Sequence, residues 1–375
     1  MKRIVSLLLV SLMLLTACVI TGCSGSGASL KLGLGVSVSV SASDATADKA
    51  GQGQATVTAA AVLVDANGKI VKAFIDVADN KVGYTADGKA VANESFQTKY
   101  EQGDAYNMVA YGGAVKEWYA QADAFCALIV GKTAAEVKAL VAGENKGTEE
   151  VLNAGCTIMI NDFAVAVEKA INNAVDSKAT EKDTLKLGIS VAQTTADATA
   201  DKAGSNKVET TLVAAAVSAD GKVTAASSDC VDVTFGFDTA GKSTFDASKT
   251  VQTKKEQGTN YGMVAYGGAA KEWNEQAAAF DAFVIGKKAD GVSAAVLTGF
   301  VQAVPTITMD GAKATVASTG ADTIYYTVDG SDPRYSDDVK TYTAAVTLTA
   351  GQTIRAYAVK AGKYASAVAE HTYAG

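Results

Sequence analysis

Apolar and polar positions alternate along several stretches in the first part of the chain, as in β-strands with one buried face. Residues 55–64 are apolar and rich in Val, Ala and Thr, and residues 69–77 alternate in strand fashion. Between them lies Asp65-Ala66-Asn67-Gly68, whose Asn-Gly pair accepts the positive φ angles of a tight turn. The pattern predicts a β-hairpin at this place and a further turn at Asp87-Gly88.

After position 116 the hydrophobic period becomes helical, and three helices are predicted before position 174. Gly131 closes the first helix, Thr133 with Glu136 forms a capping box for the second, and Asn161 caps the third. A short strand-like segment at 156–160 precedes that third helix. The inward-facing residues are Trp118, Ala122, Phe125 and Ile129, then Val137, Leu140 and Val141, then Phe163, Val167, Ile171 and Ala174. Strands that come first and helices grouped later indicate an α+β domain.

The chain contains two copies of this domain. The period of about 155 residues is too long for a solenoid unit and is typical of a duplicated domain. The matching segments are 30–33 with 185–188, 45–51 with 198–204, and 97–118 with 252–273. The second copy departs from the first at its end, where Val301 occupies the place of Thr157 and Pro305 follows without a final helix. The sequence leaves open whether the two copies contact each other.

From Pro305 the chain consists of Thr, Val, Ala and Tyr runs separated by Gly and Asp turns, which predicts a small β domain. The motif Ile-Tyr-Tyr-Thr-Val-Asp-Gly-Ser-Asp-Pro at 324–333 resembles the signature of the chitobiase/β-hexosaminidase C-terminal type of domain. The resemblance implies an Ig-like β-sandwich, and contact with a glycan in only some such domains. Four acidic residues could hold calcium through oxygen ligands, but we favour a role in shaping turns: Asp329, Asp332, Asp337 and Asp338.

The patterns along the chain predict its division into domains. It comprises a signal peptide at 1–22, a flexible tether at 23–29, repeat domain 1 at 30–176, a linker at 177–184, a truncated repeat domain 2 at 185–304, and a β-sandwich at 305–375.

The first residues have the design of a secretory signal, with a basic start and an almost unbroken apolar stretch at 4–15. Ile20-Thr21-Gly22-Cys23 fits a lipoprotein cleavage site, as does Leu15-Thr16-Ala17-Cys18. We favour Cys23 as the lipidated residue, because the Ser-Gly-Ser-Gly that follows suits a tether. A diacylglyceryl group on Cys23 would hold the protein on the outer face of a lipid membrane, whereas an uncleaved anchor helix at 4–20 is the alternative.

The amino-acid composition argues against several classes of function. The 375 residues are 48% hydrophobic, enough for packed cores, and the net charge of -7 argues against a nucleic-acid partner. His371 is the only histidine, so histidine-based catalysis and His-rich zinc sites are disfavoured. No phosphate-binding glycine loop followed by Lys-Ser/Thr occurs. Cys126, Cys156 and Cys230 do not make a disulfide framework, and we expect buried free thiols.

One segment of the first copy resembles a cofactor site. Gly155-Cys156-Thr157 leads through three residues into Asn161-Asp162-Phe163, and this resembles the C-terminal part of small extracellular FMN-binding domains. The resemblance covers about 55–174, and 208–304 more loosely. In that family a flavin transferase joins the threonine hydroxyl to FMN through phosphate, which implies Thr157 as the attachment residue and Gly155 as the point of close backbone approach. Ala154 and Cys156 depart from the family pattern, as does Val301 in the second copy.

A Met-Val-Ala-Tyr-Gly-Gly loop occurs in both copies. Its tyrosine could stack on a flat ring, its glycines could admit a ligand to the backbone, and a following lysine could meet a phosphate. These candidate residues are Tyr111, Gly112, Gly113 and Lys116 in the first copy and Tyr266, Gly267, Gly268 and Lys271 in the second. A tight turn with the tyrosine packed in the core is the equal alternative, and Trp118 and Trp273 are expected to be core residues.

Two functions follow as expectations, with no catalytic residue or metal ligand assigned. In the first, the chain is a surface lipoprotein carrying FMN, which passes electrons from a membrane donor to an acceptor outside the cell. In the second, it is a non-redox surface lipoprotein that binds a ligand, a glycan or a protein partner. A purely structural spacer is a third reading that the sequence does not exclude.

Overall fold

The computed structural model describes residues 28–93, 95–291, 302–361 and 365–375. Cys18, Cys23 and Val301 therefore lie outside the described residues. Within the described ranges, no helix has the length and apolar character needed to cross a membrane. The chain divides into two compact units, residues 1–287 and 288–375, so that the first unit holds the first sequence copy and the second copy as far as Lys287.

The first copy builds an antiparallel sheet in the order β4-β3-β2-β1-β5. Its strands are β1 (Lys31–Ser43), β2 (Gly51–Val64), β3 (Ile70–Tyr84), β4 (Ala90–Val91) and β5 (Val175–Asp176). The predicted hairpin joins β2 to β3. In its turn the Asp65 carboxylate accepts hydrogen bonds from the backbone N–H groups of Asn67 and Lys69, at 2.8 and 2.9 Å. Gly68 adopts a φ of 75°, which explains the glycine there.

The second copy repeats the three long strands in the order β6-β7-β8. They are β6 (Thr184–Ala196), β7 (Gly204–Val217) and β8 (Val223–Phe237). The hairpin register shifts between Ala216 and Val217, just as it does between Leu63 and Val64 in the first copy. The duplication therefore extends to the local irregularities of the strands.

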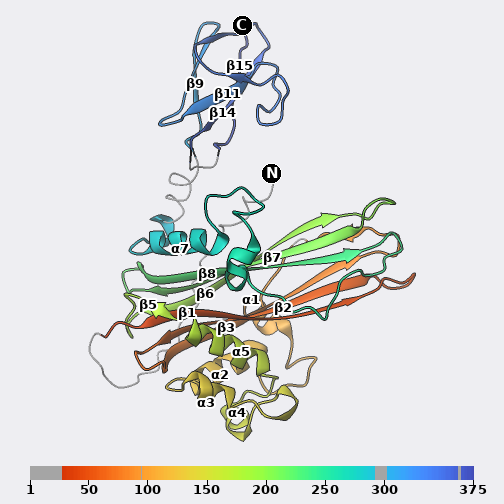
Figure 1. The fold of residues 1–375 in the computed structure, drawn as a ribbon, viewed down its shortest axis with the longest axis vertical. Coiled ribbons are helices and arrows are strands. Elements are labelled where there is room, and N and C mark those ends of the chain that lie inside the picture. Colours follow the sequence, from red (N-terminus) through yellow and green to blue (C-terminus); the bar gives the residue numbers. More distant parts are fainter. Residues whose placement is uncertain (1–27, 94, 292–301, 362–364) are drawn as a thin grey trace. The chain divides into compact units, whose positions relative to one another are not determined.

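The two sheets pack face to face and share one hydrophobic core, with β3 over β6 and β1 over β8 (Figure 1). The packing is close: a Cβ atom on Gly53 would lie only 2.3 Å from Cγ of Phe235 in the other copy. Buried polar groups also pair across the sheets, since Asn80 Nδ2 donates to Thr210 Oγ1 at 2.9 Å. The rest of the chain must accordingly fold on the outer faces of this sandwich.

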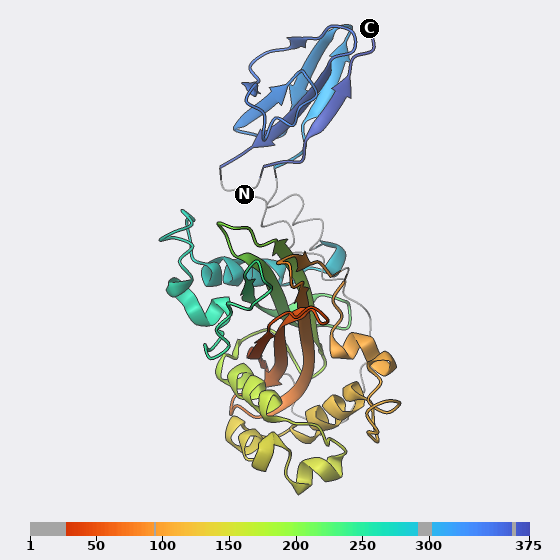
Figure 2. The same cartoon turned by 90° about the vertical axis from the view of Figure 1, so that its right-hand side faces the viewer.

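Helices cover those outer faces, on opposite sides of the sandwich (Figure 2). The first copy contributes α2 (Trp118–Leu128), α3 (Ala134–Lys138), α4 (Glu149–Ala154) and α5 (Asn161–Asn172), and the second contributes α7 (Trp273–Val284). Helix α5 lies directly on β1, where a Cβ atom at Gly33 would fall 1.8 Å from the carbonyl oxygen of Ala170. The described part of the chain thus confirms an α+β architecture.

Two local predictions were wrong. The segment 156–160 is not a strand, because it follows α4 as irregular backbone, and the N–H of Cys156 binds the carbonyl oxygen of Val151 at 3.2 Å. Asn161 is the first residue of α5 rather than its cap, and the cap residue Ile160 offers no side-chain acceptor. The apolar residues Cys156 and Ile160 made the sequence of this segment resemble that of a strand. In the structure both are buried, and they anchor a loop to the core.

The second unit is rich in strands and has its own core of Ala314, Val316, Leu348, Ile354 and Ala356. One sheet has the order β13-β10-β9 and the other the order β12-β11-β14-β15. The strands are β9 (Thr306–Asp310), β10 (Lys313–Ala317), β11 (Thr323–Thr327), β12 (Lys340–Thr341), β13 (Val346–Thr347), β14 (Thr353–Val359) and β15 (Ala369–Thr372). A β-sandwich-like C-terminal domain is therefore confirmed.

The close approach of α5 to β1 generates a stability prediction. Gly33→Ala places a methyl group against the backbone of α5, and overpacking of this kind should lower the free energy of unfolding by about 1–3 kcal/mol. Gly83→Ala is the matched control, since the nearest heavy atom to its Cβ would be Val91 Cβ at an ordinary 3.5 Å. Urea unfolding followed by circular dichroism measures both, and equal destabilisation would contradict the packing described.

Candidate binding loops and the threonine site

A short helical platform precedes the tyrosine loop in each copy. In the first copy it consists of α1 (Lys99–Gln102) and η2 (Gly103–Tyr106). The Thr98 hydroxyl accepts a hydrogen bond from the N–H of Glu101 at 3.1 Å, and the Glu101 carboxylate accepts one from the N–H of Thr98 at 2.9 Å. The second copy forms the same capping box with Thr253 and Glu256, ahead of α6 (Lys254–Gln257) and η4 (Gly258–Tyr261).

A buried aspartate ties each platform to the sheet beneath it. Asp76 of β3 accepts hydrogen bonds from its neighbour Val77 N–H at 2.7 Å and from Tyr100 N–H at 3.1 Å. Asp229 of β8 binds Cys230 N–H and Lys255 N–H at the same two distances. Burial raises the pKa of Asp76 to about 7 and also raises the pKa of Asp229. Sequence reasoning missed both aspartates, because nothing in the strand pattern distinguishes them from exposed ones.

The loop itself is closed by a glutamate. The two carboxylate oxygens of Glu117 accept hydrogen bonds from the N–H groups of Met108 and Val109, at 2.8 and 3.1 Å. Ala114 N–H then returns to the carbonyl oxygen of Met108 at 3.0 Å. In the second copy Glu272 makes the equivalent pair of bonds to Met263 and Val264, at 2.9 and 3.2 Å.

Both glycines of the loop are explained by this geometry. A Cβ atom at Gly112 would meet the carbonyl oxygen of Met108 at 2.6 Å, and Gly113 has a φ of 67°. Gly267 and Gly268 repeat these values closely, at 2.7 Å and 66°. The tight turn predicted from the sequence is present in both copies.

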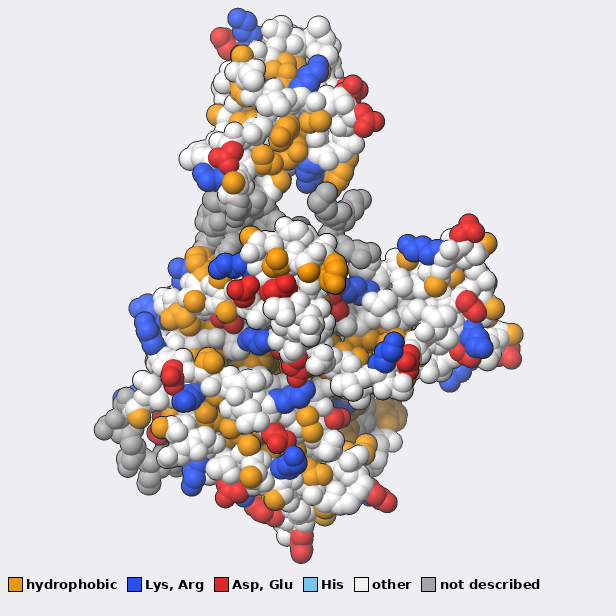
Figure 3. Space-filling view, in the orientation of Figure 1, with side chains coloured by type: hydrophobic (Ala, Val, Ile, Leu, Met, Phe, Trp, Pro, Cys, Tyr) orange, Lys and Arg blue, Asp and Glu red, His pale blue; other side chains and the backbone are white. Residues whose placement is uncertain are grey.

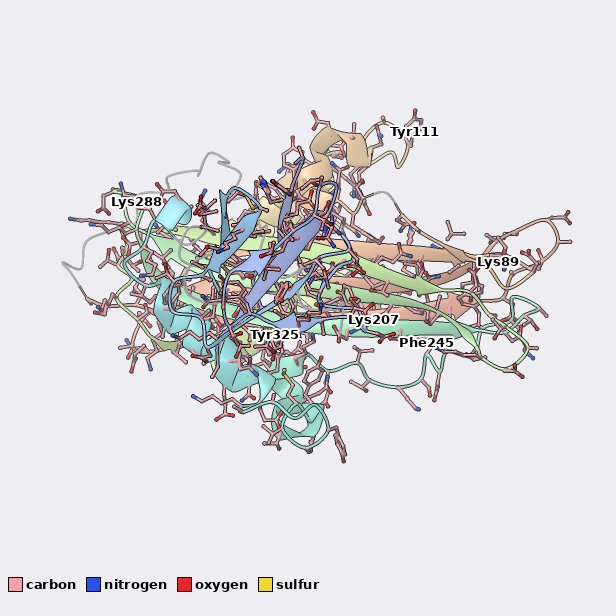
Figure 4. The ribbon with its side chains drawn as sticks, turned by 90° about the horizontal axis from the view of Figure 1, so that it is seen from above. Lys89, Tyr111, Lys207, Phe245, Lys288 and Tyr325 are labelled. Carbon is pink, nitrogen blue, oxygen red and sulfur yellow. The ribbon has the colours of Figure 1, made fainter. Side chains whose placement is uncertain are left out.

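The tyrosines point into solvent. Tyr111 is 88% exposed (Figure 4) and Tyr266 is 92% exposed, so neither is packed in the core. Trp118 is buried at the start of α2, as expected, and contacts Phe163 edge to face, whereas Trp273 is only partly buried. The aromatic rings that the two copies expose at these loops are therefore the tyrosines and not the tryptophans.

The threonine site of Gly155 and Thr157 lies elsewhere in the first copy, and the structure places Lys116, predicted with the tyrosine loop, beside it. Thr157 is exposed, and its N–H and hydroxyl both donate to Oε1 of Gln121, at 2.8 and 3.0 Å. Gly155 ends α4 with a φ of 94°, and a Cβ atom there would lie 2.3 Å from Nζ of Lys116. Gln121 is buried at 1% exposure and was missed, because a glutamine on a helix carries no sequence signal for such a contact.

The site fits the attachment point of a phosphate-linked group in two respects. Thr157 is an exposed residue, and the Lys116 ammonium beside Gly155 can meet a negative charge. Lys271 is exposed in the second copy, where Val301 lies outside the described residues. A hollow of about 390 Å³ lies beside α3 and α4, and its lining includes Lys132, Glu136 and Glu150 but not Thr157.

The three cysteines beyond the signal region are buried free thiols, as predicted. Burial raises the pKa of Cys156 to about 11 and the pKa of Cys230 to about 12, so both remain protonated at neutral pH. In the second unit, Asp329 accepts hydrogen bonds from the N–H and hydroxyl of Ser331, at 3.0 and 2.6 Å, which is turn chemistry. On the face drawn in Figure 3, acidic and basic side chains are interspersed, so charge alone does not single out a site there.

Comparison with known proteins bears on the second unit alone. Residues 315–373 match the family described as Fn3 associated, which agrees with the β-sandwich-like fold found there. No curated protein matches the chain.

The buried Asp76 carboxyl predicts a pH dependence of stability. Its pKa of about 7 in the folded protein exceeds the usual value of 3.8, so its stabilising effect is complete below pH 3.8 and is lost as the pH rises through 7. Between pH 5 and pH 8 this group alone should lower the free energy of unfolding by about 3 kcal/mol. Asp76→Asn keeps the acceptor oxygen and should show a smaller loss over that range in denaturant titrations. An unchanged pH slope in the variant would argue against a raised pKa.

Proposed function

We propose that the chain is an extracytoplasmic surface lipoprotein, anchored through Cys23, that binds a polymeric glycan with two tyrosine loops. The observation that carries this proposal is the exposure of Tyr111 and Tyr266 on loops that are otherwise fully determined by internal contacts.

Several residues repeated around each loop have structural roles, whereas the tyrosine ring points into solvent. Thr98 and Glu101 cap a helix, Glu117 closes the loop, and the glycines permit its backbone. An aromatic ring in solvent gains nothing for folding, because its apolar surface stays hydrated. Such a ring on a rigid loop does favour binding, since little conformational freedom is lost when a partner is bound.

The arrangement of the loops favours a repeating ligand. Segments 99–117 and 254–272 lie on opposite sides of the sandwich in Figures 2 and 4. Two similar loops that face away from each other cannot close on one small molecule, but each can stack its tyrosine on a sugar of a different glycan strand. Simultaneous binding at both would raise the apparent affinity for a polymer.

A second candidate function is covalent attachment of FMN at Thr157. The position of Lys116 Nζ close to Gly155, two residues before the exposed Thr157, favours it. Thr157 would carry the phosphate and Lys116 would meet its charge, while the flavin would supply redox chemistry for electrons from a membrane donor.

The glycan proposal predicts a loss of binding when the rings are removed. On arrays of polysaccharide fragments, Tyr111→Ala and Tyr266→Ala should each weaken binding of the mature chain. The double variant should lose at least about fivefold, because stacking on an aromatic ring is worth about 0.5–1.5 kcal/mol per site. Tyr335→Ala, an exposed tyrosine of the second unit, is the control. Wild-type binding by the double variant would exclude the loops as the site.

The flavin candidate predicts a covalent adduct on the mature protein produced together with a flavin transferase. Intact mass and fluorescence on a denaturing gel should show one flavin per chain, which Thr157→Ala removes. Gln121→Ala should lower its yield, because Gln121 orients the hydroxyl that must react. A wild-type chain with no adduct would leave the resemblance one of fold alone.

A further inference from the structure

A cluster of four charged residues lies beneath the tyrosine platform of the second copy. Lys254, the first residue of α6, is only 4% exposed, and its Nζ lies 3.3 Å from Oδ1 of Asp232 and 3.4 Å from Oε2 of Glu209. Lys207 Nζ lies 2.6 Å from the other carboxylate oxygen of Asp232, Oδ2. Figure 4 shows Lys207 along the strands of the second sheet, on whose outer face these side chains meet. One carboxyl group is therefore held between two ammonium groups.

Aromatic rings enclose the lysine. Lys254 Nζ lies 5.2 Å from the centre of the Tyr261 ring and 5.8 Å from that of Trp273. The Tyr261 hydroxyl also donates to Asp232 at 3.3 Å. These rings limit the access of water to the pair of Lys254 and Asp232, and they hold the amine and the carboxyl at a distance that suits reaction between them.

The first copy repeats the lysine and its rings but not the charged partners. Lys99 Nζ lies 5.2 Å from the centre of the Tyr106 ring and 5.9 Å from that of Trp118. There Asp79 occupies the place of Asp232, and it accepts hydrogen bonds from the neutral side chains of Gln54 and Thr56 at 2.6 and 2.8 Å. The second copy has Lys207 and Glu209 at the corresponding strand positions. Charged pairs that are withdrawn from water add little to stability compared with neutral partners, so stability alone does not account for the difference.

We propose that Lys254 and Asp232 form an intramolecular isopeptide bond, with Glu209 as the proton carrier. Desolvation works to lower the pKa of Lys254, but Cys230, Asp232 and Glu209 together raise it, so the amine begins as an ammonium group and needs a base. Glu209 is in contact with that ammonium group and is the base the reaction requires.

The step balances within the cluster. Glu209 takes a proton from the Lys254 ammonium group, and the freed amine attacks Cγ of Asp232. Lys207 neutralises the charge on Oδ2 as the N–C bond forms. One C–O bond breaks, and that oxygen leaves as water with two protons that came from the ammonium group, one of them delivered by Glu209. Ammonium and carboxylate thus become a neutral amide and one water, with no oxidant or other reactant.

The bond would fasten α6 covalently to β8. Because α6 begins the platform that carries the Tyr266 loop, the second loop would resist being pulled away from the sheet. This inference does not depend on what the loops bind, or on whether they bind anything.

Mass spectrometry of the purified full chain tests the proposal. The wild-type protein should be lighter than its sequence by one water, and digestion should yield the peptides that contain residues 232 and 254 joined together. Lys254→Arg keeps the positive charge and should restore the full mass and the separate peptides. Glu209→Gln should slow or prevent the link, while the Asp79 and Lys99 peptides of the first copy serve as an unlinked internal control.

Asp232→Asn gives a second readout. An asparagine would release ammonia instead of water, so a linked variant should have the same final mass as linked wild type, although its unlinked mass differs. Separate linear peptides in the wild-type digest, after prolonged incubation of the folded chain, would overturn the proposal.

Discussion

The packing of one sequence copy against the other is the constraint on which the rest of the first unit depends. The sheets meet so closely that Gly53 has no room for a side chain against Phe235. Tyr84 and Phe237, which end corresponding strands, stack with ring centres 4.5 Å apart. Once both inner faces are used in one core, each copy has only its outer face left for helices and loops. The opposed positions of the two tyrosine loops follow from this packing.

Carboxylates hold the platforms and the loops in place. Asp76 and Glu117 hold the platform and the loop of the first copy by accepting backbone N–H groups, and Asp229 and Glu272 do the same in the second. Burial raises the pKa of Asp76 to about 7 and also raises that of Asp229, and the hydrogen bonds from backbone N–H groups work against that shift. Hydrophobic burial is therefore not needed at the loop tip, which leaves the tyrosine free to face solvent.

Local features could be predicted from the sequence, and features that depend on distant contacts could not. The turn at Asn67-Gly68 and the helix that begins at Trp118 are determined within a few residues, so their patterns were sufficient. The alternation of apolar and polar residues along β2 and β7 shows that one face of each strand is buried. It does not show that this face packs against the sheet of the other copy. Cys156 resembled a strand residue because burial of a loop and burial of a strand leave the same apolar signal.

The candidate site was predictable to a similar degree. The Tyr-Gly-Gly repeats identified the loops, and the resemblance to FMN-binding domains identified Gly155 and Thr157. Gln121, Asp76 and Asp229 could not be found in this way, because each acquires its role only through residues far away in the chain. The paired residues Lys254 and Asp232 likewise belong to different elements and meet only in the folded sheet.

One sandwich with a binding loop on each of two opposite sides should hold two glycan strands at once. The measurement uses beads coated with a polysaccharide that the protein binds. Mature protein is added, and aggregation of the beads is monitored as turbidity. We expect wild-type protein to aggregate the beads, and protein with either Tyr111→Ala or Tyr266→Ala to bind them without aggregation. Aggregation by a single variant to the same extent as wild type would contradict the claim.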